Sequence, residues 1–139
     1  MKNKKLRFGL VGVLNTLVDV VAYGVLVATG LNFYIANIIS TTLGMVCSFS
    51  LNRSFTFRAT SGNRLRQIGL FLVVTLFGLW VIQPAVIYLT TGLANAAFGF
   101  LPDHLLAIVP KGFATVASLV WNYVWYNRVV FTDGKVVDQ

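Results

Sequence analysis

Four long apolar runs dominate the chain and leave little of it for anything else. They cover residues 8–29, 33–52, 67–91 and 105–126 of the 139-residue sequence. Each run has at least roughly the 20 residues that a helix needs to cross about 30 Å of hydrocarbon. A helix satisfies its own backbone hydrogen bonds in lipid. The runs therefore predict an all-α, polytopic membrane protein with four transmembrane helices.

The composition excludes most soluble functions. Hydrophobic residues make up 57% of the chain and charged residues only 11%, which is typical of a lipid-solvated protein rather than a soluble enzyme. The net charge of +7 would suggest nucleic acid in a soluble domain. Here the basic residues flank the apolar runs, where positive charge orients a membrane protein. We expect one transmembrane domain over residues 1–139, no enzymatic activity and no nucleic-acid partner.

The distribution of charge predicts the orientation. Both termini and the segment from Arg53 to Arg66 are basic, whereas the turn at residues 30–33 and the segment at residues 92–104 carry no Lys or Arg. Positive residues favour the cytoplasmic side, so both termini should be cytoplasmic. The basic start of the chain resembles a signal peptide, but the apolar run after it is too long. We interpret it as a retained first span.

Polar residues interrupt the first run. Gly12, Asn15 and Asp19 follow i, i+3, i+7 spacing and share one helix face. An Asp at the centre of a span costs about 2.5–3.5 kcal/mol on insertion scales. This cost favours a bundle interior or a hydrated cavity. Thr16 has a simpler interpretation, a hydrogen bond to the carbonyl of Gly12, and Asn15 has one in interhelical packing.

Two further polar residues lie inside the later runs. Lys111 lies within the fourth run, where it can pair with Asp19, extend to the outer headgroups or offer a cation to an anionic ligand. Gln83 precedes Pro84 in the third run, and the proline should kink that helix. The amide of Gln83 can then bond the freed backbone or a ligand.

The second run is rich in small and hydroxyl residues. Small residues let helices approach closely, so this composition predicts tight packing or oligomerisation. A hydroxyl-lined polar path is the alternative. The residues concerned are Ala36, Ser40, Thr41, Thr42, Gly44, Ser48 and Ser50.

An internal repeat connects the ends of the second and fourth runs. Residues 48–57 align without gaps with residues 122–131, and each copy has an aromatic residue, an Asn-Arg pair and a closing Phe. The copies are not identical, because Ser48 aligns with Asn122 and the Asn-Arg pair is displaced by one position. The repeat predicts two related hairpins.

The Asn-Arg pairs have two interpretations. Asn52-Arg53 and Asn127-Arg128 lie beside aromatic residues, so they are suited to anchor the cytoplasmic interface. The planar fork of Arg also suits bidentate contact with phosphate. We therefore treat Arg53 and Arg128 as candidate phosphate contacts.

These features together resemble those of a known family. Residues 7–16 with Asp19, residues 48–57, Lys111 and residues 122–131 occur in the order and on the spans expected for the GtrA-like family. The resemblance extends over essentially the whole chain. It implies a multi-pass protein of the bacterial inner membrane that uses no cofactor.

The resemblance also implies a function. A GtrA-like protein is expected to be a flippase that moves a polyprenyl-phosphate-linked monosaccharide, such as undecaprenyl-phosphate glucose, across the bilayer for cell-envelope polysaccharide modification. Glycosyltransferases of the same pathway are its expected partners. Four short spans can hardly enclose such a headgroup, so we expect a homodimer.

The candidate substrate-binding residues are polar groups on or beside the spans: Asn15, Asp19, Asn52, Arg53, Gln83, Lys111, Asn122, Asn127 and Arg128. A metal site is not expected, because Cys47 and His104 are the only residues of their types. A proton-coupled small-molecule exporter and a non-transporting membrane subunit for a glycosyltransferase remain alternative functions.

Overall fold

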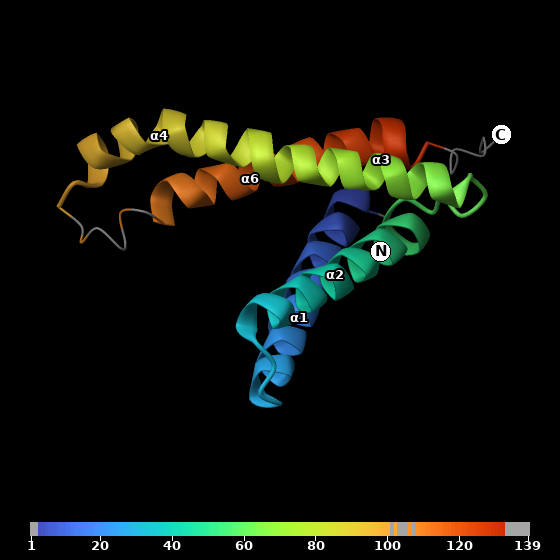
Figure 1. Cartoon of the computed structure of the whole chain (residues 1–139). Helices are drawn as coiled ribbons and strands as arrows, with labels where there is room; N and C mark the ends of the chain where they lie inside the picture. The colour runs from blue at the N-terminus through green and yellow to red at the C-terminus, as the bar shows by residue number, and fades with distance from the viewer. Residues whose placement is uncertain (1–2, 101, 103–105, 107, 133–139) are drawn as a thin grey trace. The chain divides into compact units, whose positions relative to one another are not determined.

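The computed structural model describes residues 3–100, 102, 106 and 108–132, and the regular structure in this part of the chain is helical. Asp103 and His104 lie outside the described residues. The chain divides into two compact units, residues 1–62 with 131–139 and residues 63–130. We describe the two units separately (Figure 1).

Unit 1 is a helical hairpin. Helix α1 (Lys4–Ala28) packs against α2 (Phe33–Leu51), which continues without a break into the π-helical turn η1 (Asn52–Thr56). Figure 1 shows α1 and α2 side by side and joined by a tight turn. The start of α1 and the end of α2 therefore lie at the same end of the unit.

The turn of this hairpin depends on one glycine. Gly30 has a φ of 85°, a conformation that glycine adopts without steric penalty. The N–H of Gly30 donates to the carbonyl of Val27 at 3.0 Å and that of Leu31 to the carbonyl of Leu26 at 3.2 Å. This pair of bonds is the Schellman arrangement that closes a helix, so the chain reverses within four residues of α1.

Asparagine residues set where three of the helices begin. The side chains of Asn3, Asn32 and Asn63 each accept a hydrogen bond from a backbone N–H two or three residues further on, at 3.0, 2.9 and 3.1 Å. Such N-caps satisfy donors that have no partner inside the helix. The first and third helices consequently start several residues before the apolar runs that predicted them.

Unit 2 contains the third and fourth helical segments. Helix α3 (Arg64–Phe77), the π-helical turn η2 (Gly78–Ile82) and α4 (Gln83–Phe98) follow one another directly. Helix α6 (Ile108–Trp125) packs against this long helix and continues into a further π-helical turn, η3 (Tyr126–Val130). The third helix therefore has 35 residues from Arg64 to Phe98.

The length of this helix corrects one expectation. The third span was predicted to end at Thr91 and a loop to begin at Gly92, but the helix continues to Phe98. Residues 92–98 are mostly small and apolar, and none of them forbids helical backbone. Pro84 lies in the first turn of α4, directly after η2, and the kink predicted for it stays a prediction. A π-turn accommodates a local change in hydrogen bonding while the helix continues.

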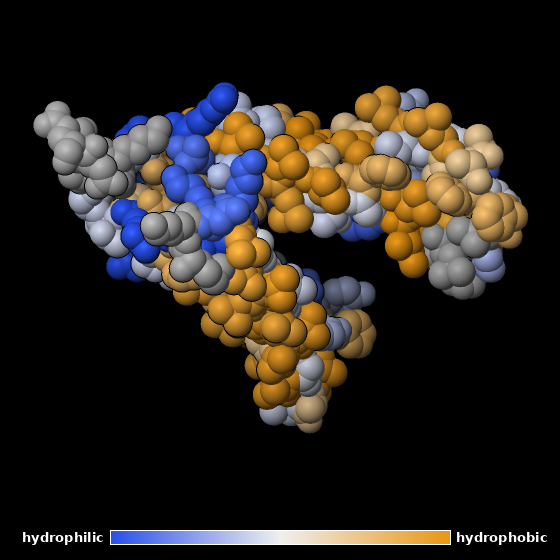
Figure 2. All heavy atoms as spheres, turned by 180° about the vertical axis from the view of Figure 1, so that it is seen from behind, coloured by the Kyte–Doolittle hydropathy of each residue, from blue (hydrophilic) through white to orange (hydrophobic). Residues whose placement is uncertain are grey.

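The helices have the length and surface of membrane spans. Three of them, Lys4–Ala28, Phe33–Thr56 and Arg64–Phe98, are long and apolar enough to cross a bilayer. Large hydrophobic side chains are exposed on every helix. Figure 2 shows hydrophobic residues covering most of the helix surfaces, with hydrophilic residues gathered at one end of the unit 1 hairpin. The chain is thus an all-helical, polytopic membrane protein.

Burial supports the internal repeat. Three buried residues of α2 recur every fourth position, and each of these three has a buried counterpart in α6 that lies 74 positions later. The turns η1 and η3 are displaced by the same 74 positions, which is the alignment without gaps that the sequence predicted. The paired buried residues are Ala36, Ser40 and Gly44 with Pro110, Ala114 and Ser118.

The closing phenylalanines of the two copies also have a packing role. Phe57 and Phe131 are both buried in unit 1 and stack with ring centroids 5.1 Å apart. Phe49 contacts Phe131 at 5.9 Å. Offset aromatic pairs of this kind contribute about 0.5–1.5 kcal/mol beyond the area they bury. The closing phenylalanine of each copy therefore helps to build the aromatic core of unit 1.

Candidate functional site

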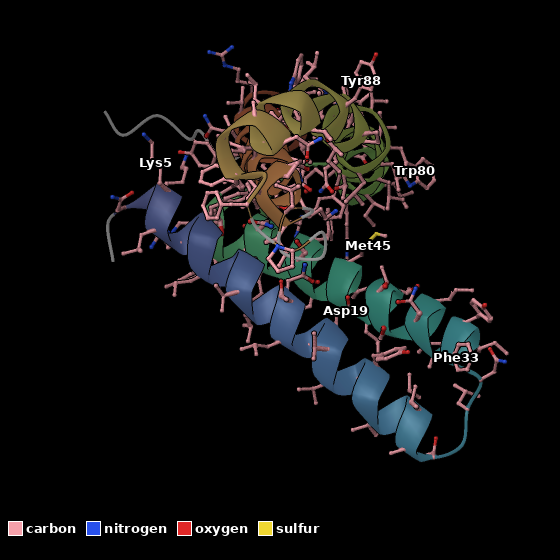
Figure 3. All side chains as sticks on the ribbon, turned by 90° about the vertical axis from the view of Figure 1, so that its left-hand side faces the viewer. Lys5, Asp19, Phe33, Met45, Trp80 and Tyr88 are labelled. Carbon is pink, nitrogen blue, oxygen red and sulfur yellow. The ribbon has the colours of Figure 1, made fainter. Side chains whose placement is uncertain are left out.

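The polar face predicted for the first span packs against α2. A Cβ atom added to Gly44 would lie 2.9 Å from Asn15 Oδ1 and 3.4 Å from Asp19 Cβ. Figure 3 shows Asp19 between α1 and α2. The Asn15 oxygen is buried and accepts no hydrogen bond. The absence of a side chain at Gly44 thus lets a polar face of α1 lie directly against the neighbouring helix.

Thr16 has the structural role that was anticipated for it. Its hydroxyl donates to the carbonyl of Gly12 at 3.0 Å. The hydrogen bond lies within one helix, four residues back. This prediction is confirmed, and Thr16 has no part in the polar contact with α2.

The first Asn-Arg pair lies in η1. Asn52 is 2% exposed, and its Nδ2 donates to Ser48 Oγ at 3.3 Å. Its Oδ1 is buried without a partner. Arg53 is half-buried beside it.

Arg53 holds the loop that follows its own helix. Its Nη2 donates to the carbonyl oxygen of Thr60 at 2.6 Å and lies 3.5 Å from the carbonyl oxygen of Gly62. Within this loop Arg58 has a φ of 53°, an uncommon conformation for a residue other than glycine. The guanidinium therefore stabilises the loop that follows η1 within unit 1, and the phosphate contact expected of Arg53 stays a prediction.

In unit 2 the structure brings two predicted residues together. Lys111 Nζ on α6 donates to Gln83 Oε1 on α4 at 2.7 Å. Gln83 thus bonds a side chain of the neighbouring helix, where the sequence suggested the freed backbone or a ligand. Asp19 belongs to unit 1 and Lys111 to unit 2, so pairing of these two charges stays a prediction.

Asn122 repeats the environment of Asn15. A Cβ atom added to Gly78 would lie 2.9 Å from Ser118 Oγ and 3.1 Å from Asn122 Oδ1. The Asn122 oxygen is likewise buried without a partner. Each unit therefore holds an unpaired asparagine oxygen against a glycine of the adjacent helix.

The second Asn-Arg pair lies in η3, where Asn127 is half-buried and Arg128 is exposed. The residue before them is the buried one. Tyr126 is 2% exposed, its hydroxyl lies 2.5 Å from Thr75 Oγ1, and its ring stacks on Phe71 at 5.0 Å. Arg128 thus remains available to an interfacial group, while Tyr126 anchors the turn to α3.

One residue that the sequence assigned only to orientation is buried. Arg7 is 7% exposed, its Nη1 donates to the carbonyl of Phe55 at 2.9 Å, and its Nε has no partner. The guanidinium also lies 5.7 Å from the centre of the Phe55 ring. It was missed because a basic residue at the start of a span ordinarily faces the headgroups.

A second internal alignment, between the first and third helices, contained the sequence signal that Arg7 is buried. Residues 7–11 align with residues 67–71 through Gly9 with Gly69 and Leu10 with Leu70. In this register Arg7 corresponds to the buried Gln67, and Val11 to the buried Phe71. The shared burial pattern shows that Arg7 occupies a core position of its hairpin.

Within the described residues, no group of three His, Cys, Asp or Glu side chains is placed to hold a metal.

The sequence was compared with known proteins over its whole length. No curated protein and no solved structure matches the chain significantly. The model of one family, described as GtrA/DPMS, transmembrane domain, matches residues 7–131, which include every predicted site residue. The chain belongs to the GtrA/DPMS transmembrane-domain family.

Proposed function

We propose that this protein is a flippase for a polyprenyl-phosphate-linked monosaccharide, such as undecaprenyl-phosphate glucose, in the bacterial inner membrane. It acts as a transporter rather than an enzyme and supplies the sugar for cell-envelope polysaccharide modification. Family membership supports a membrane role connected with polyprenyl-phosphate sugars. The substrate and the direction of movement are the finer part of the proposal.

The proposed topology has four spans and cytoplasmic termini. The 18-residue helix α6 continues into η3, and together they are long enough to form the fourth span. The basic residues near the start of α1, in the loop after η1 and in η3 then share the cytoplasmic side. A single domain of two hairpins results, with Arg53 and Arg128 at the inner interface.

The observation that carries the proposal is a set of unpaired acceptors inside apolar helices. Asn15 Oδ1 and Asn122 Oδ1 are buried and without partners, which is unfavourable in a protein interior. A sugar offers several hydroxyl donors, so an entering headgroup would satisfy these oxygens. An inert membrane anchor has no reason to keep them.

The charged groups complement the other half of the headgroup. An anion alone in hydrocarbon is strongly disfavoured, so a flippase needs cations along the route. Lys111 carries its ammonium on α6 within hydrogen-bonding distance of Gln83. The anionic phosphate is proposed to pass from the interfacial arginines to this lysine, while the polyprenyl tail stays in lipid.

A homodimer remains part of the proposal, with a different contact surface from the one first considered. Ala36, Ser40 and Gly44 are already buried within the chain. A second copy would therefore pack on exposed apolar residues, such as Ile35, Ile38 and Val46 on α2. Cross-linking of single cysteine variants at Ile35, Ile38 and Val46 in native membranes tests this surface, and failure to cross-link at all three positions refutes it.

Transport of a labelled lipid-linked sugar in proteoliposomes tests the function. The wild-type protein should move undecaprenyl-phosphate glucose between leaflets, and Asp19→Asn and Lys111→Met should each reduce the rate at least about tenfold, the loss expected for a charge-assisted contact. Lys5→Met is the matched control, because Lys5 is exposed at the start of α1 (Figure 3).

The outcomes separate the alternatives. Absence of leaflet exchange by the wild-type protein, with recovery of a glycosyltransferase from the same membranes, favours the non-transporting subunit. Exchange of protons with small cations but not of the lipid favours the exporter. Wild-type rates in both site variants would refute the proposed route even if the lipid is moved.

A further inference from the structure

Arg7 is a buried cation with little charge compensation from the described residues of unit 1. Its Nε is buried without a partner and its described hydrogen bond goes to a neutral carbonyl. Within residues 3–62 the sequence has only one acidic residue, Asp19, about 18 Å further along α1 at 1.5 Å per residue. Burial of a charge without a counter-ion is strongly unfavourable. An anion from outside the described chain would remove this penalty.

Two more unpaired polar groups lie in the adjoining turn. Asn52 and Thr56 are 2% and 1% exposed, and both Asn52 Oδ1 and Thr56 Oγ1 are buried without partners. In η1 the N–H of Phe57 donates to the carbonyl of Asn52 at 2.8 Å. This i→i+5 pattern gives more than four residues per turn, so residues 52 and 56 project from nearly the same face.

Arg7 reaches this same turn. Its Nη1 bonds the carbonyl of Phe55, the residue immediately before Thr56, and α1 packs against η1. The start of α1 and the end of α2 coincide in the hairpin. We call Arg7, Asn52 and Thr56 the Arg7 cluster.

The cluster can present three donors to one ligand. Arg7 Nε–H and the Thr56 hydroxyl are donors as they stand. The amide of Asn52 can turn over, because its oxygen and nitrogen exchange places at little cost in shape. Ser48 would then donate to Oδ1, and Nδ2 would occupy the unpaired position. Three donors on and beside one helical turn, one of them charged, suit a phosphate group.

The second hairpin provides an internal comparison. At the corresponding positions it has Gln67, Tyr126 and Val130, all buried. Tyr126 is paired with Thr75, and Val130 has no polar side-chain atom. The second hairpin therefore forms without a cation at the position of Arg7 and without the polar side chains of Asn52 and Thr56, so the polar set in unit 1 is not a requirement of packing.

We propose that the Arg7 cluster binds the phosphate group of a membrane lipid. This inference rests on the proposed function, because it takes polyprenyl phosphate as the main lipid that supplies the phosphate group. A phospholipid headgroup offers the same chemistry. Arg7 is in the first turn of α1, and helix ends fray readily. A phosphate can thus enter by movement of that turn, from the cytoplasmic interface.

Native mass spectrometry of the full-length protein in mild detergent tests this binding. The probes are undecaprenyl phosphate, undecaprenol without the phosphate, and phosphatidylglycerol. The wild-type protein should bind undecaprenyl phosphate more tightly than undecaprenol. Arg7→Gln introduces the residue found at position 67. It should weaken the binding of undecaprenyl phosphate at least about tenfold and leave the binding of undecaprenol unchanged.

Thr56→Val is the second variant, since it matches the shape of the original residue and the valine found at position 130. It should weaken the binding of undecaprenyl phosphate about three- to tenfold. Lys5→Gln removes the same charge as Arg7→Gln from an exposed position in the same turn, and its binding should stay within about twofold of wild type. Loss of phosphatidylglycerol binding in parallel would identify any lipid phosphate as the ligand, and loss confined to undecaprenyl phosphate would identify the carrier.

Two results would overturn the inference. Wild-type affinity for both phosphate lipids in Arg7→Gln and Thr56→Val shows that the cluster is only a clamp on η1. Equal loss of undecaprenol and undecaprenyl phosphate shows a general defect in lipid binding. Leaflet exchange of the lipid is measured on the same variants, so that failure of this inference can be told from failure of the proposed function. If the protein transports the lipid but the variants keep wild-type phosphate binding, only the phosphate site at the Arg7 cluster is refuted.

Discussion

Replacement of Gly44 by alanine tests the close approach of α1 and α2. The new methyl group would lie 2.9 Å from Asn15 Oδ1 and 3.4 Å from Asp19 Cβ, while nonbonded carbon atoms prefer separations of about 3.5–4.0 Å. The Asn15 oxygen must therefore move by about half an ångström, and it has little free space because it is buried.

The expected size follows from two opposing effects. Overpacking of a tight contact costs about 1–3 kcal/mol, whereas replacing glycine by alanine inside a helix gains about 0.5–1 kcal/mol. Gly44→Ala should therefore destabilise the protein by about 0.5–2 kcal/mol. Gly24→Ala is the matched control, because nothing lies within 4 Å of its added methyl group, and it should be neutral or slightly stabilising.

Reversible unfolding in mixed detergent and SDS micelles, followed by far-ultraviolet circular dichroism, measures the difference. The double variant Gly44→Ala with Asn15→Ala completes a mutant cycle, in which removal of the asparagine should relieve most of the effect. Equal stability of Gly44→Ala and Gly24→Ala would show that the two helices are not in the contact described, and the polar face of α1 would lose its assigned position.

Three further predictions use the same unfolding assay or hydrogen exchange. Gly78→Ala should destabilise more than Gly44→Ala, because three side chains lie within 3.4 Å of the added methyl group; the reverse order would contradict the packing of unit 2. Tyr126→Phe removes the 2.5 Å contact with Thr75 and should cost about 0.5–1.5 kcal/mol, while an unchanged stability would mean that the hydroxyl is solvated. Arg53→Gln should speed amide exchange in residues 57–62 with little effect on global stability, since it frees the loop carbonyl at Thr60; unchanged exchange there argues against the clamp.

The extent of sequence prediction differs between the helices and their contacts. Periodic apolar runs identified all four helical segments, because lipid leaves a spanning chain few alternatives to helix. The helix boundaries were less accurate, since an asparagine cap and the mostly apolar residues 92–98 extended α3 and α4 beyond the predicted run. The repeat was visible in the sequence, and the shared burial of α2 and α6 agrees with it.

The candidate site was predicted in part. Spacing along one helix placed Asn15 and Asp19 on a common face, and the contact with Gly44 agrees with that face. The bond from Lys111 to Gln83 joins residues 28 positions apart, and spacing along a chain contains no information on such a pair. Arg7 was interpreted as an interfacial charge, because exposure at a helix end is the ordinary state of a basic residue.

What the sequence determined by itself is the solvent of this protein and its secondary structure, because hydropathy and local periodicity act within single segments. What only the tertiary structure decided is which polar atoms lack partners. Arg7 Nε, Asn15 Oδ1, Asn52 Oδ1 and Asn122 Oδ1 are unpaired because the folding of the described residues places no hydrogen-bonding group beside them. Hydrogen-bond satisfaction is a property of the folded surroundings rather than of any residue, so it appears only when the helices are placed together.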